Sequence, residues 1–296
     1  MTVPPPDAVR RAPPAAAQPA GDVDPALIVW GLSKRFVGRA GPVDALSEIN
    51  FSVAPGEFVC LVGPSGCGKS TLLSILAGLD GATSGRVVVA GRVVKGPGTD
   101  RGMVFQRDNL FPWLTVRNNV RFGSKLKAVR RTFTPERARA VEERCDQLLD
   151  VVGLSRFARS YPHELSGGMR QRAALARALV NQPRVMLMDE PFGALDAQTR
   201  EEMQELLARL SERQGTTTVF VTHDVEEAVL LADRILVMAA HPGRVAKEVR
   251  VTLPRPRTLE MRLDPAFAQV RAEVLTSLYT RERRQQSKAA LDRILR

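Results

Sequence analysis

The feature that most constrains this chain is the glycine-rich segment GPSGCGKS at residues 63–70. It follows an apolar stretch at residues 58–62 and precedes a helical pattern at residues 71–77. Glycines let successive backbone N–H groups point at one anion, and the positive end of the following helix adds to the attraction. We therefore expect this segment to cradle phosphate groups, with Lys69 at the terminal phosphates and the Ser70 hydroxyl available to Mg²⁺.

A second constraint is the apolar run VMLMDE at residues 185–190, which ends in two acids. An unpaired buried carboxylate is costly, so the end of this predicted strand should face solvent or a cation. We expect Asp189 to hold Mg²⁺ through its water ligands and Glu190 to polarise the water that attacks the γ-phosphate. These two motifs indicate a P-loop NTPase, and they are equally compatible with a kinase or a GTPase.

The pattern of the chain from residue 26 onward predicts an α/β fold. Short β-rich runs alternate with helical runs, which is typical of a mixed, largely parallel sheet. From about residue 107 to 165 the β pattern gives way to a helical one, so we expect an inserted helical subdomain. The predicted strands cover residues 58–63, 87–89, 101–105, 185–189, 218–222 and 235–238.

The two ends of the chain differ from this core. Residues 1–25 are rich in Pro and Ala, and we expect them to be disordered. Residues 246–296 are predicted to form a C-terminal helical extension, which packs through a stripe at helical spacing. The stripe consists of Phe267, Val270, Val274 and Leu278. No internal repeat is visible, which indicates a single nucleotide-binding domain at residues 26–245.

The segment LSGGMRQ at residues 165–171 narrows the function. It opens a predicted helix with a hydroxyl and two glycines, so it forms a second anion-binding helix N-terminus. One chain then has two phosphate cradles but only one complete set of lysine and Mg²⁺ ligands. The economical solution is that two copies face head to tail, and each copy closes this signature over the ATP of the other.

Here the sequence resembles the ABC ATPase family, whose signature is L-S-G-G-Q. Met169 replaces the Gln of that signature, which leaves the backbone donors unchanged. The resemblance implies that Gln106 reaches Mg²⁺ and the attacking water, and that His223 contacts the γ-phosphate. It also implies that Asp196 lies in a loop that crosses the dimer interface, where Ala194 stands in place of a common Ser.

Phe36 stands where the family places an aromatic ring that stacks on adenine, although a Phe at the end of a strand can also belong to the core. The predicted catalytic residues are Glu190, His223 and Gln106, and the predicted Mg²⁺ ligands are Ser70, Gln106 and Asp189. The predicted ATP contacts are Phe36, Gly63, Pro64, Ser65, Gly66, Cys67, Gly68, Lys69, Ser70, Thr71, Ser166, Gly167, Gly168 and Asp196.

The resemblance also implies partners and a place in the cell. It implies a homodimer on transmembrane permease subunits, indirectly served by a substrate-binding protein, at the cytoplasmic face of the inner membrane. Three runs resemble the nitrate, sulfonate and taurine importers: residues 192–200, 241–245 and 253–257. Residues 107–116 follow Gln106 and carry Phe111 and Trp113, which either anchor a permease helix in a cleft or fill the core of the helical subdomain.

Composition leaves two other functions open. Lys and Arg total 43 against 32 Asp and Glu, so the net charge of +11 also suits a soluble ABC ATPase that acts on nucleic acid or ribosomes. We expect no nucleic-acid partner, because such proteins tend to carry two cassettes or long coiled-coil arms. A regulatory module that holds ATP without hydrolysing it is disfavoured by Glu190 and His223. Every catalytic motif precedes Pro242, so we expect hydrolysis to survive truncation near Arg257.

Overall fold

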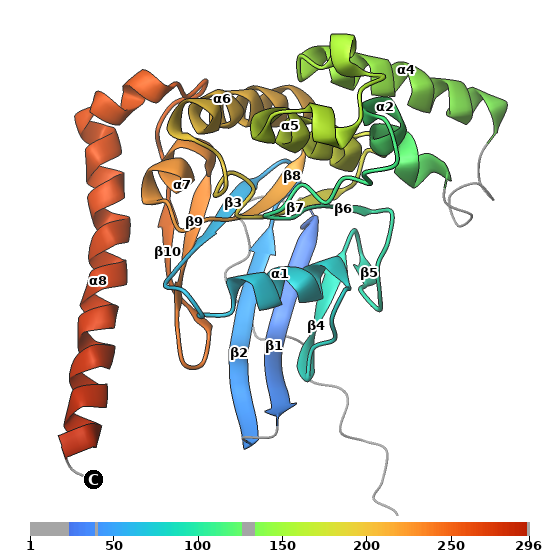
Figure 1. Cartoon of the computed structure of the whole chain (residues 1–296). Coiled ribbons are helices and arrows are strands. Elements are labelled where there is room, and N and C mark those ends of the chain that lie inside the picture. Colours follow the sequence, from blue (N-terminus) through green and yellow to red (C-terminus); the bar gives the residue numbers. More distant parts are fainter. Residues whose placement is uncertain (1–23, 39–40, 126–133, 295–296) are drawn as a thin grey trace, which may run out of the picture.

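The computed structural model describes residues 24–38, 41–125 and 134–294 (Figure 1). The predicted disorder of residues 1–25 falls almost entirely outside this part of the chain. Within it, no helix combines the length and the apolar character that crossing a membrane requires.

A six-stranded sheet forms the centre of the molecule, in the order β10-β9-β3-β8-β7-β6. Neighbouring strands from β9 to β6 are parallel, and β10 runs antiparallel to β9 at one edge. Every residue of β3 and β8 is buried, which explains their continuous apolar or β-branched sequences. The strands are β3 (Phe58–Val62), β6 (Arg101–Val104), β7 (Val185–Asp189), β8 (Thr217–Val221), β9 (Arg234–Ala239) and β10 (Arg244–Arg250). The predicted, largely parallel sheet is confirmed.

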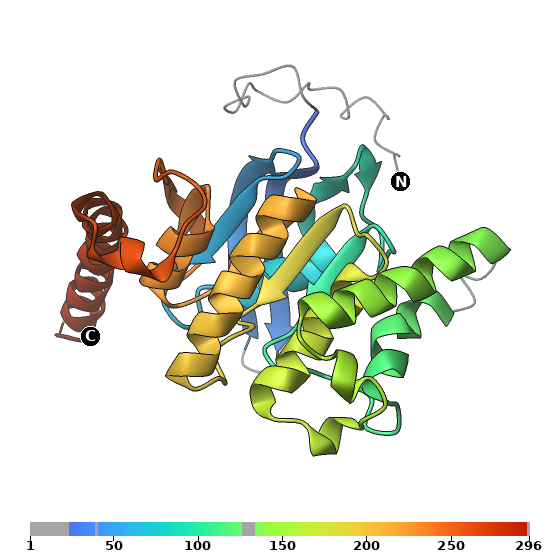
Figure 2. The same cartoon turned by 90° about the horizontal axis from the view of Figure 1, so that it is seen from above.

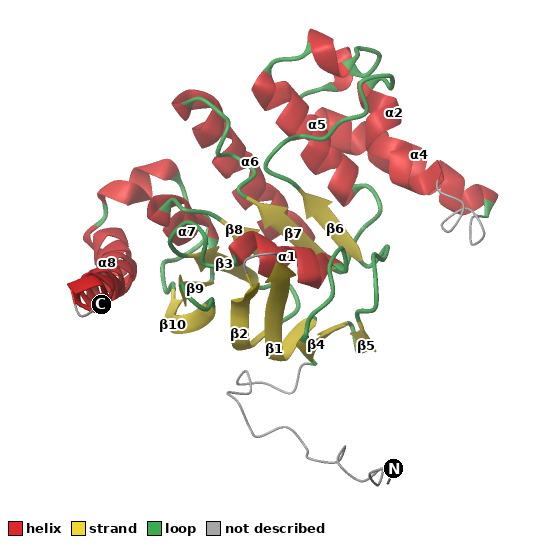
Figure 3. Ribbon diagram, turned by 60° about the horizontal axis from the view of Figure 1, so that its bottom comes forward, coloured by secondary structure: helices red, strands yellow, loops and turns green. Residues whose placement is uncertain are grey.

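A second, antiparallel sheet of four strands was not predicted from the sequence, apart from the strand at residues 87–89, which was assigned to the parallel sheet. Its order is β2-β1-β4-β5. The strands are β1 (Leu27–Gly38), β2 (Gly41–Val53), β4 (Ser84–Val89) and β5 (Arg92–Val93). Helix α1 (Lys69–Ala77) lies between the two sheets (Figure 3). Its Leu72, Leu73 and Leu76 share one buried cluster with residues of both sheets, so the helix that follows the phosphate loop is fixed from two sides.

The other face of the large sheet is covered by helices. Figure 2 shows the inserted helical subdomain at one side of the molecule, beside the long helix α6. The subdomain consists of α2 (Val116–Val120), α4 (Pro135–Val151) and α5 (Gly167–Leu179), with short 3₁₀ segments at Arg121–Lys125, Ser155–Phe157 and Pro162–Glu164. Helices α6 (Ala197–Gln214) and α7 (Val225–Leu231) complete this layer. The predicted insertion is therefore confirmed, and α5 connects it back to β7.

The C-terminal extension packs against the edge of the large sheet. After β10, the 3₁₀ helix η4 (Leu259–Leu263) leads into α8 (Pro265–Ile294), which runs beside β9 and β10 (Figure 1). Phe267 and Val274 are buried, while Val270 and Leu278 are partly buried against the same core. The packing role predicted for this stripe is confirmed.

Candidate active site

The phosphate loop surrounds the side chain of Lys69, which belongs to the same loop. Lys69 is 7% exposed, and its Nζ donates to the carbonyl oxygens of Gly63 at 2.7 Å and Pro64 at 3.1 Å. A Cβ at Gly63 would lie 2.8 Å from Cys67 Sγ and 2.9 Å from the Met238 oxygen, so only glycine fits there. The ammonium group is thus held at the centre of the loop, before the first turn of α1.

Cys67 belongs to the underside of this loop. Its side chain is fully buried, and burial raises the pKa of its thiol. The thiol is therefore a packing group, and any contact of Cys67 with nucleotide has to come from its backbone.

Two of the side chains predicted to hold Mg²⁺ contact one another near the lysine. Ser70 Oγ, in the first turn of α1, donates to Asp189 Oδ1 at the end of β7 over 3.1 Å. Burial raises the pKa of Asp189, and the hydrogen bond from Ser70 acts in the opposite direction. A divalent cation here would favour the ionised carboxylate. Mg²⁺ commonly takes one or two protein oxygens and completes its shell with water and phosphate oxygens, so this pair fits Mg²⁺.

Glu190 and His223 form a pair opposite the lysine. His223 Nδ1 lies 3.1 Å from Glu190 Oε2, and the two side chains come from the ends of neighbouring strands β7 and β8. Glu190 has a φ of +43°, which is strained for a residue with a side chain. Its N–H donates to the Val221 oxygen at 2.9 Å, and its own carbonyl accepts from the Gly193 N–H at 3.1 Å. The strained backbone aims the carboxylate toward the phosphate loop.

These groups share one cavity of about 380 Å³. The residues that line it are Ala45, Ser65, Gly66, Gly68, Lys69, Ser70, Thr71, Glu190 and His223. A larger cleft of about 920 Å³ is lined by the start of β1, the β2–β3 turn and the residues around Gln182, and it includes none of the predicted site residues. Of these two cavities, the smaller one is therefore the one that predicted site residues line.

Two further predicted residues lie near this cavity. Gln106 is exposed just beyond β6, and its Nε2 and Glu190 Oε2 each lie 3.8 Å from where a Cβ on Gly193 would be. The side chain of Phe36 is 43% exposed, and Lys34 Nζ lies 4.7 Å from its ring centroid. Phe36 is therefore not a core residue. Its stacking on adenine stays a prediction.

The signature segment forms the second helix N-terminus, as predicted. Ser166 Oγ accepts the Met169 N–H at 3.3 Å and caps α5. A Cβ at Gly168 would lie 2.3 Å from Thr199 Cγ2 of α6, so this glycine allows the two helices to approach. Asp196 caps α6 by accepting the Thr199 N–H at 3.0 Å, and its hydrogen bonds with Thr199 lower its pKa. Ser166 and Gly167 are exposed, and neither lines the cavity at the phosphate loop of the same chain.

Known proteins share these features. The sequence profile of the ABC transporter family matches residues 46–193. The chain is 48% identical to a nitrate import ATP-binding protein of Synechocystis over 86% of this chain and 96% of that protein. It is 46% identical to a taurine import ATP-binding protein of Jannaschia over 86% of this chain and 95% of that protein. An aliphatic sulfonates import ATP-binding protein of Bacillus cereus is 44% identical over 83% of this chain and 92% of that protein.

The chain belongs to the ABC transporter family. A solved dimer of an ATP-binding cassette, bound to ADP and Pi in a post-hydrolysis state, matches this structure with a TM-score of 0.65. That cassette is 34% identical, and the match covers 77% of this chain and all of that cassette. The ABC ATPase fold and the ATP-hydrolysing activity predicted from the motifs are thus confirmed.

Sequence reasoning missed the polar contacts that connect the parts of this ABC ATPase. Arg170, just after the signature, donates from Nε to Asp108 Oδ2 at 3.0 Å and from Nη1 to the Leu165 oxygen at 2.7 Å. Arg177, two turns further along α5, donates to the carbonyls of Asp108 and Asn109. The signature helix is thereby fastened to the segment that follows Gln106. Nothing in the local sequence around Asp108 marks it as a partner of α5.

Proposed function

We propose that this chain is the ATP-hydrolysing subunit of an importer for small anions of the nitrate, sulfonate or taurine class. Two copies would form two composite ATP sites and dock onto transmembrane permease subunits at the cytoplasmic face of the inner membrane. A substrate-binding protein would deliver the anion to these permease subunits. The similarity to nitrate, taurine and aliphatic sulfonates import proteins over most of their length supports the class of cargo. The observation that carries the proposal is the Glu190–His223 pair at the mouth of the phosphate loop.

In the proposed reaction, each group at the cavity has one task. The loop amides and Lys69 hold the β- and γ-phosphates of ATP, and Glu190 accepts the proton of the attacking water. His223 contacts the γ-phosphate and, through its 3.1 Å contact with Glu190, holds the carboxylate in position. Gln106 Nε2 and Glu190 Oε2 lie at the same distance from the Cβ position of Gly193, 3.8 Å, and Gln106 would sense the same phosphate.

Ser70 and Asp189 would hold Mg²⁺, which offsets the negative charge of the phosphates during transfer. The Ser70 hydroxyl and the Asp189 carboxylate already face one another at the end of β7. We infer that ATP completes the coordination, since Mg²⁺ is usually shared between protein oxygens and phosphates.

The exposed signature supports the composite site. Ser166 and Gly167 present a capped helix N-terminus to solvent, and neither residue lines the cavity at the phosphate loop of the same chain. A second copy that faces the first would bring this N-terminus to the γ-phosphate from the open side.

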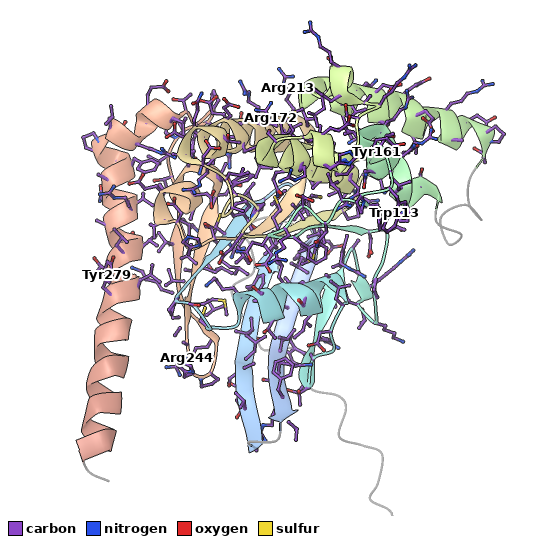
Figure 4. All side chains as sticks on the ribbon, in the orientation of Figure 1. Trp113, Tyr161, Arg172, Arg213, Arg244 and Tyr279 are labelled. Atoms are coloured by element: carbon purple, nitrogen blue, oxygen red, sulfur yellow. The ribbon has the colours of Figure 1, made fainter. Side chains whose placement is uncertain are left out.

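The permease would dock beside the segment that follows Gln106. Here Trp113 is 70% exposed and stands at the edge of the helical subdomain (Figure 4). The Phe111 ring lies 5.5 Å from Trp113 and 4.3 Å from Phe122. Phe111 therefore belongs to the packing of the subdomain, whereas Trp113 is free to anchor a partner helix.

The test uses the complex in liposomes with its permease and binding protein. Nitrate, taurine and an alkanesulfonate are supplied in turn, and ATP hydrolysis is measured. We expect one of these anions to stimulate hydrolysis. Stimulation by DNA or ribosomes instead of any of the three would contradict the proposal.

Trp113→Ala tests the docking surface within that complex. We expect the isolated subunit to keep its basal hydrolysis and its melting temperature, while cargo-stimulated turnover falls about tenfold or more, because a lost anchor costs about 2 kcal/mol of docking energy. Phe111→Ala is the matched control, and it should lower the melting temperature instead. Normal stimulation by the Trp113→Ala complex would refute the docking site.

A further inference from the structure

The loop that carries His223 continues directly into α7, so the placement of this helix determines where His223 lies. Asp224 caps α7, and its Oδ1 accepts the N–H of Glu226 at 2.9 Å and of Glu227 at 3.2 Å. The Asp224 N–H in turn donates to Thr222 Oγ1 at 3.0 Å. Any element that holds α7 therefore also holds the histidine.

The far end of α7 is held by the C-terminal extension. Arg257 is only 5% exposed, and its Nη1 donates to the carbonyls of Val229 at 3.2 Å and Ala232 at 2.5 Å. These carbonyls belong to the last turn of α7 and its cap, where a helix has unsatisfied acceptors. Burial lowers the pKa of Arg257 to about 10, which leaves the guanidinium charged at neutral pH.

A second connection from the extension runs through a buried amide. Arg262, on η4, donates from Nη2 to Gln204 Oε1 of α6 at 2.8 Å. Gln204 Nε2 donates in turn to Glu227 Oε1 of α7 at 3.1 Å. Gln204 is 1% exposed and Glu227 is 4% exposed, so solvent cannot replace either bond.

This chain of hydrogen bonds has only one satisfied orientation. A guanidinium has no acceptor and an ionised carboxylate has no donor, so the amide oxygen must face Arg262 and the amide nitrogen must face Glu227. Burial raises the pKa of Glu227, whereas its bonds with Thr222 and Gln204 lower it. Both hydrogen bonds thus run in one direction, with the donor on the side of the extension and the acceptor on the side of α7.

Glu227 lies directly behind the catalytic groups. A small cavity of about 30 Å³ is bordered by Glu227, Thr222, His223 and Glu190. The chain that starts at Arg262 thus ends on the wall of the space next to the Glu190–His223 pair.

We propose that Arg262, Gln204 and Glu227 form a positioning relay, through which the C-terminal extension holds the His223 loop in the geometry for hydrolysis. The proposal rests on the role proposed above for His223. It adds to the expectation that hydrolysis survives truncation near Arg257: the truncated chain would lack Arg262 and should hydrolyse ATP more slowly.

The first test compares two arginines of the extension in the full chain. Arg262→Met removes the relay donor and a longer ion pair, Arg262 Nε to Glu226 Oε2 at 3.9 Å. Arg271→Met removes the ion pair from Arg271 Nη1 to Glu226 Oε1 at 2.5 Å, which also joins the extension to α7. We expect Arg262→Met to lower kcat about fivefold, equivalent to about 1 kcal/mol in barrier, with KM for ATP unchanged. Arg271→Met should keep both constants.

Because Arg262 Nη1 also contacts Glu201 Oε1 at 2.9 Å, Glu201→Gln serves as a second control. It weakens that ion pair and leaves the Gln204 bond in place, so kcat should stay at the wild-type value. Equal kcat values for the Arg262 and Arg271 variants, or a loss in Glu201→Gln as large as in Arg262→Met, would overturn the relay.

The second test reverses the polarity of the relay. Gln204→Glu alone sets two carboxylates against each other and should lower kcat. Adding Glu227→Gln restores donors and acceptors in a new order, because the introduced carboxylate at position 204 accepts from both Arg262 and the introduced amide. We expect the double variant to regain most of the lost kcat. A double variant no better than Gln204→Glu would count against positioning through hydrogen bonds.

His223→Ala separates the two proposals. If His223→Ala keeps full hydrolysis, the role of His223 fails. If His223→Ala is inactive while Arg262→Met matches Arg271→Met, only the relay fails.

Discussion

The two glycine-rich helix N-termini of this chain both present backbone N–H groups to an anion, but only the phosphate loop also has a lysine and acidic side chains beside it. The phosphate loop encloses Lys69, and Ser70, Glu190 and His223 line the same cavity. The signature loop has a capping serine and exposed backbone, and its nearest cation, Arg170, is directed to Leu165 and Asp108. At the signature, anion affinity thus comes from the helix N-terminus alone, whereas hydrolysis requires side chains from the ends of several strands.

The parallel sheet explains why only one of the two loops is complete. Strands β3, β8 and β7 are neighbours and run in the same direction, so their carboxyl ends lie at one edge. That edge places the phosphate loop, His223 and the Asp189–Glu190 pair together. The signature follows a 3₁₀ turn of the helical subdomain instead of a strand, so no strand end delivers acids to it.

Glu190→Gln tests this difference with the largest expected effect. The amide cannot accept the proton of the attacking water, so hydrolysis should fall by about 10²–10⁴-fold while ATP binding stays. Turnover and ATP affinity of the purified chain are measured separately, and Lys69→Ala serves as the comparison that weakens binding itself. A Glu190→Gln chain within about threefold of wild-type turnover would rule out Glu190 as the base.

Mixing two inactive variants tests whether the signature of one copy completes the ATP site at the phosphate loop of another copy. Lys69→Ala damages the phosphate loop and Ser166→Arg damages the signature. A heterodimer places both changes in one composite site and leaves the other intact, so the mixture should hydrolyse ATP faster than either parent. The heterodimer is verified by differently tagged chains, and a fully inactive mixture would argue against shared sites.

The sequence sufficed to predict where the phosphate loop and the two acids lie, because their motifs are local. GPSGCGKS and the acids at the end of VMLMDE are each recognisable within a few residues, and the structure places them at the ends of strands β3 and β7. The antiparallel sheet was missed because β1 and β2 are half-buried and irregular, with several register shifts. The relay was missed because Arg262 and Gln204 are 58 residues apart, and only the fold brings them together.

A pair of glycine variants compares the backbones of the two loops. Gly68 has a φ of +90°, and a Cβ there would lie 2.7 Å from Leu46 Cδ2. The signature tolerates a Cβ at Gly167, although not at Gly168, because a Cβ on Gly167 would have its nearest neighbours at 3.9 Å. Gly68→Ala should therefore lower the free energy of unfolding by about 2 kcal/mol.

Gly167→Ala should leave stability unchanged or raise it slightly, because alanine favours the first turn of α5. Chemical denaturation of both variants provides the comparison. Equal losses in both would mean that the phosphate loop is no more constrained than the signature.

The smallest effect, on the pH dependence of stability, is expected from Glu227. This residue lies beside Glu190 and His223, and among the described residues the signature has no corresponding buried acid. Burial, followed by the nearby Asp224, raises its pKa, while Thr222, Gln204 and Arg200 act in the opposite direction. The folded chain therefore binds this proton more tightly than the unfolded chain does. The resulting stabilisation is full below the unfolded pKa and is lost as pH rises through the folded pKa.

Glu227→Gln removes this titration, so its melting temperature relative to wild type should increase from pH 4 to pH 7. We expect a relative change of about 2 °C, and scanning calorimetry at several pH values measures it. Glu205→Gln, at a partly exposed position of α6, is the control for losing a carboxylate. Parallel curves for Glu227→Gln and wild type would show that Glu227 titrates alike in the folded and unfolded chains, and burial would then not raise its pKa.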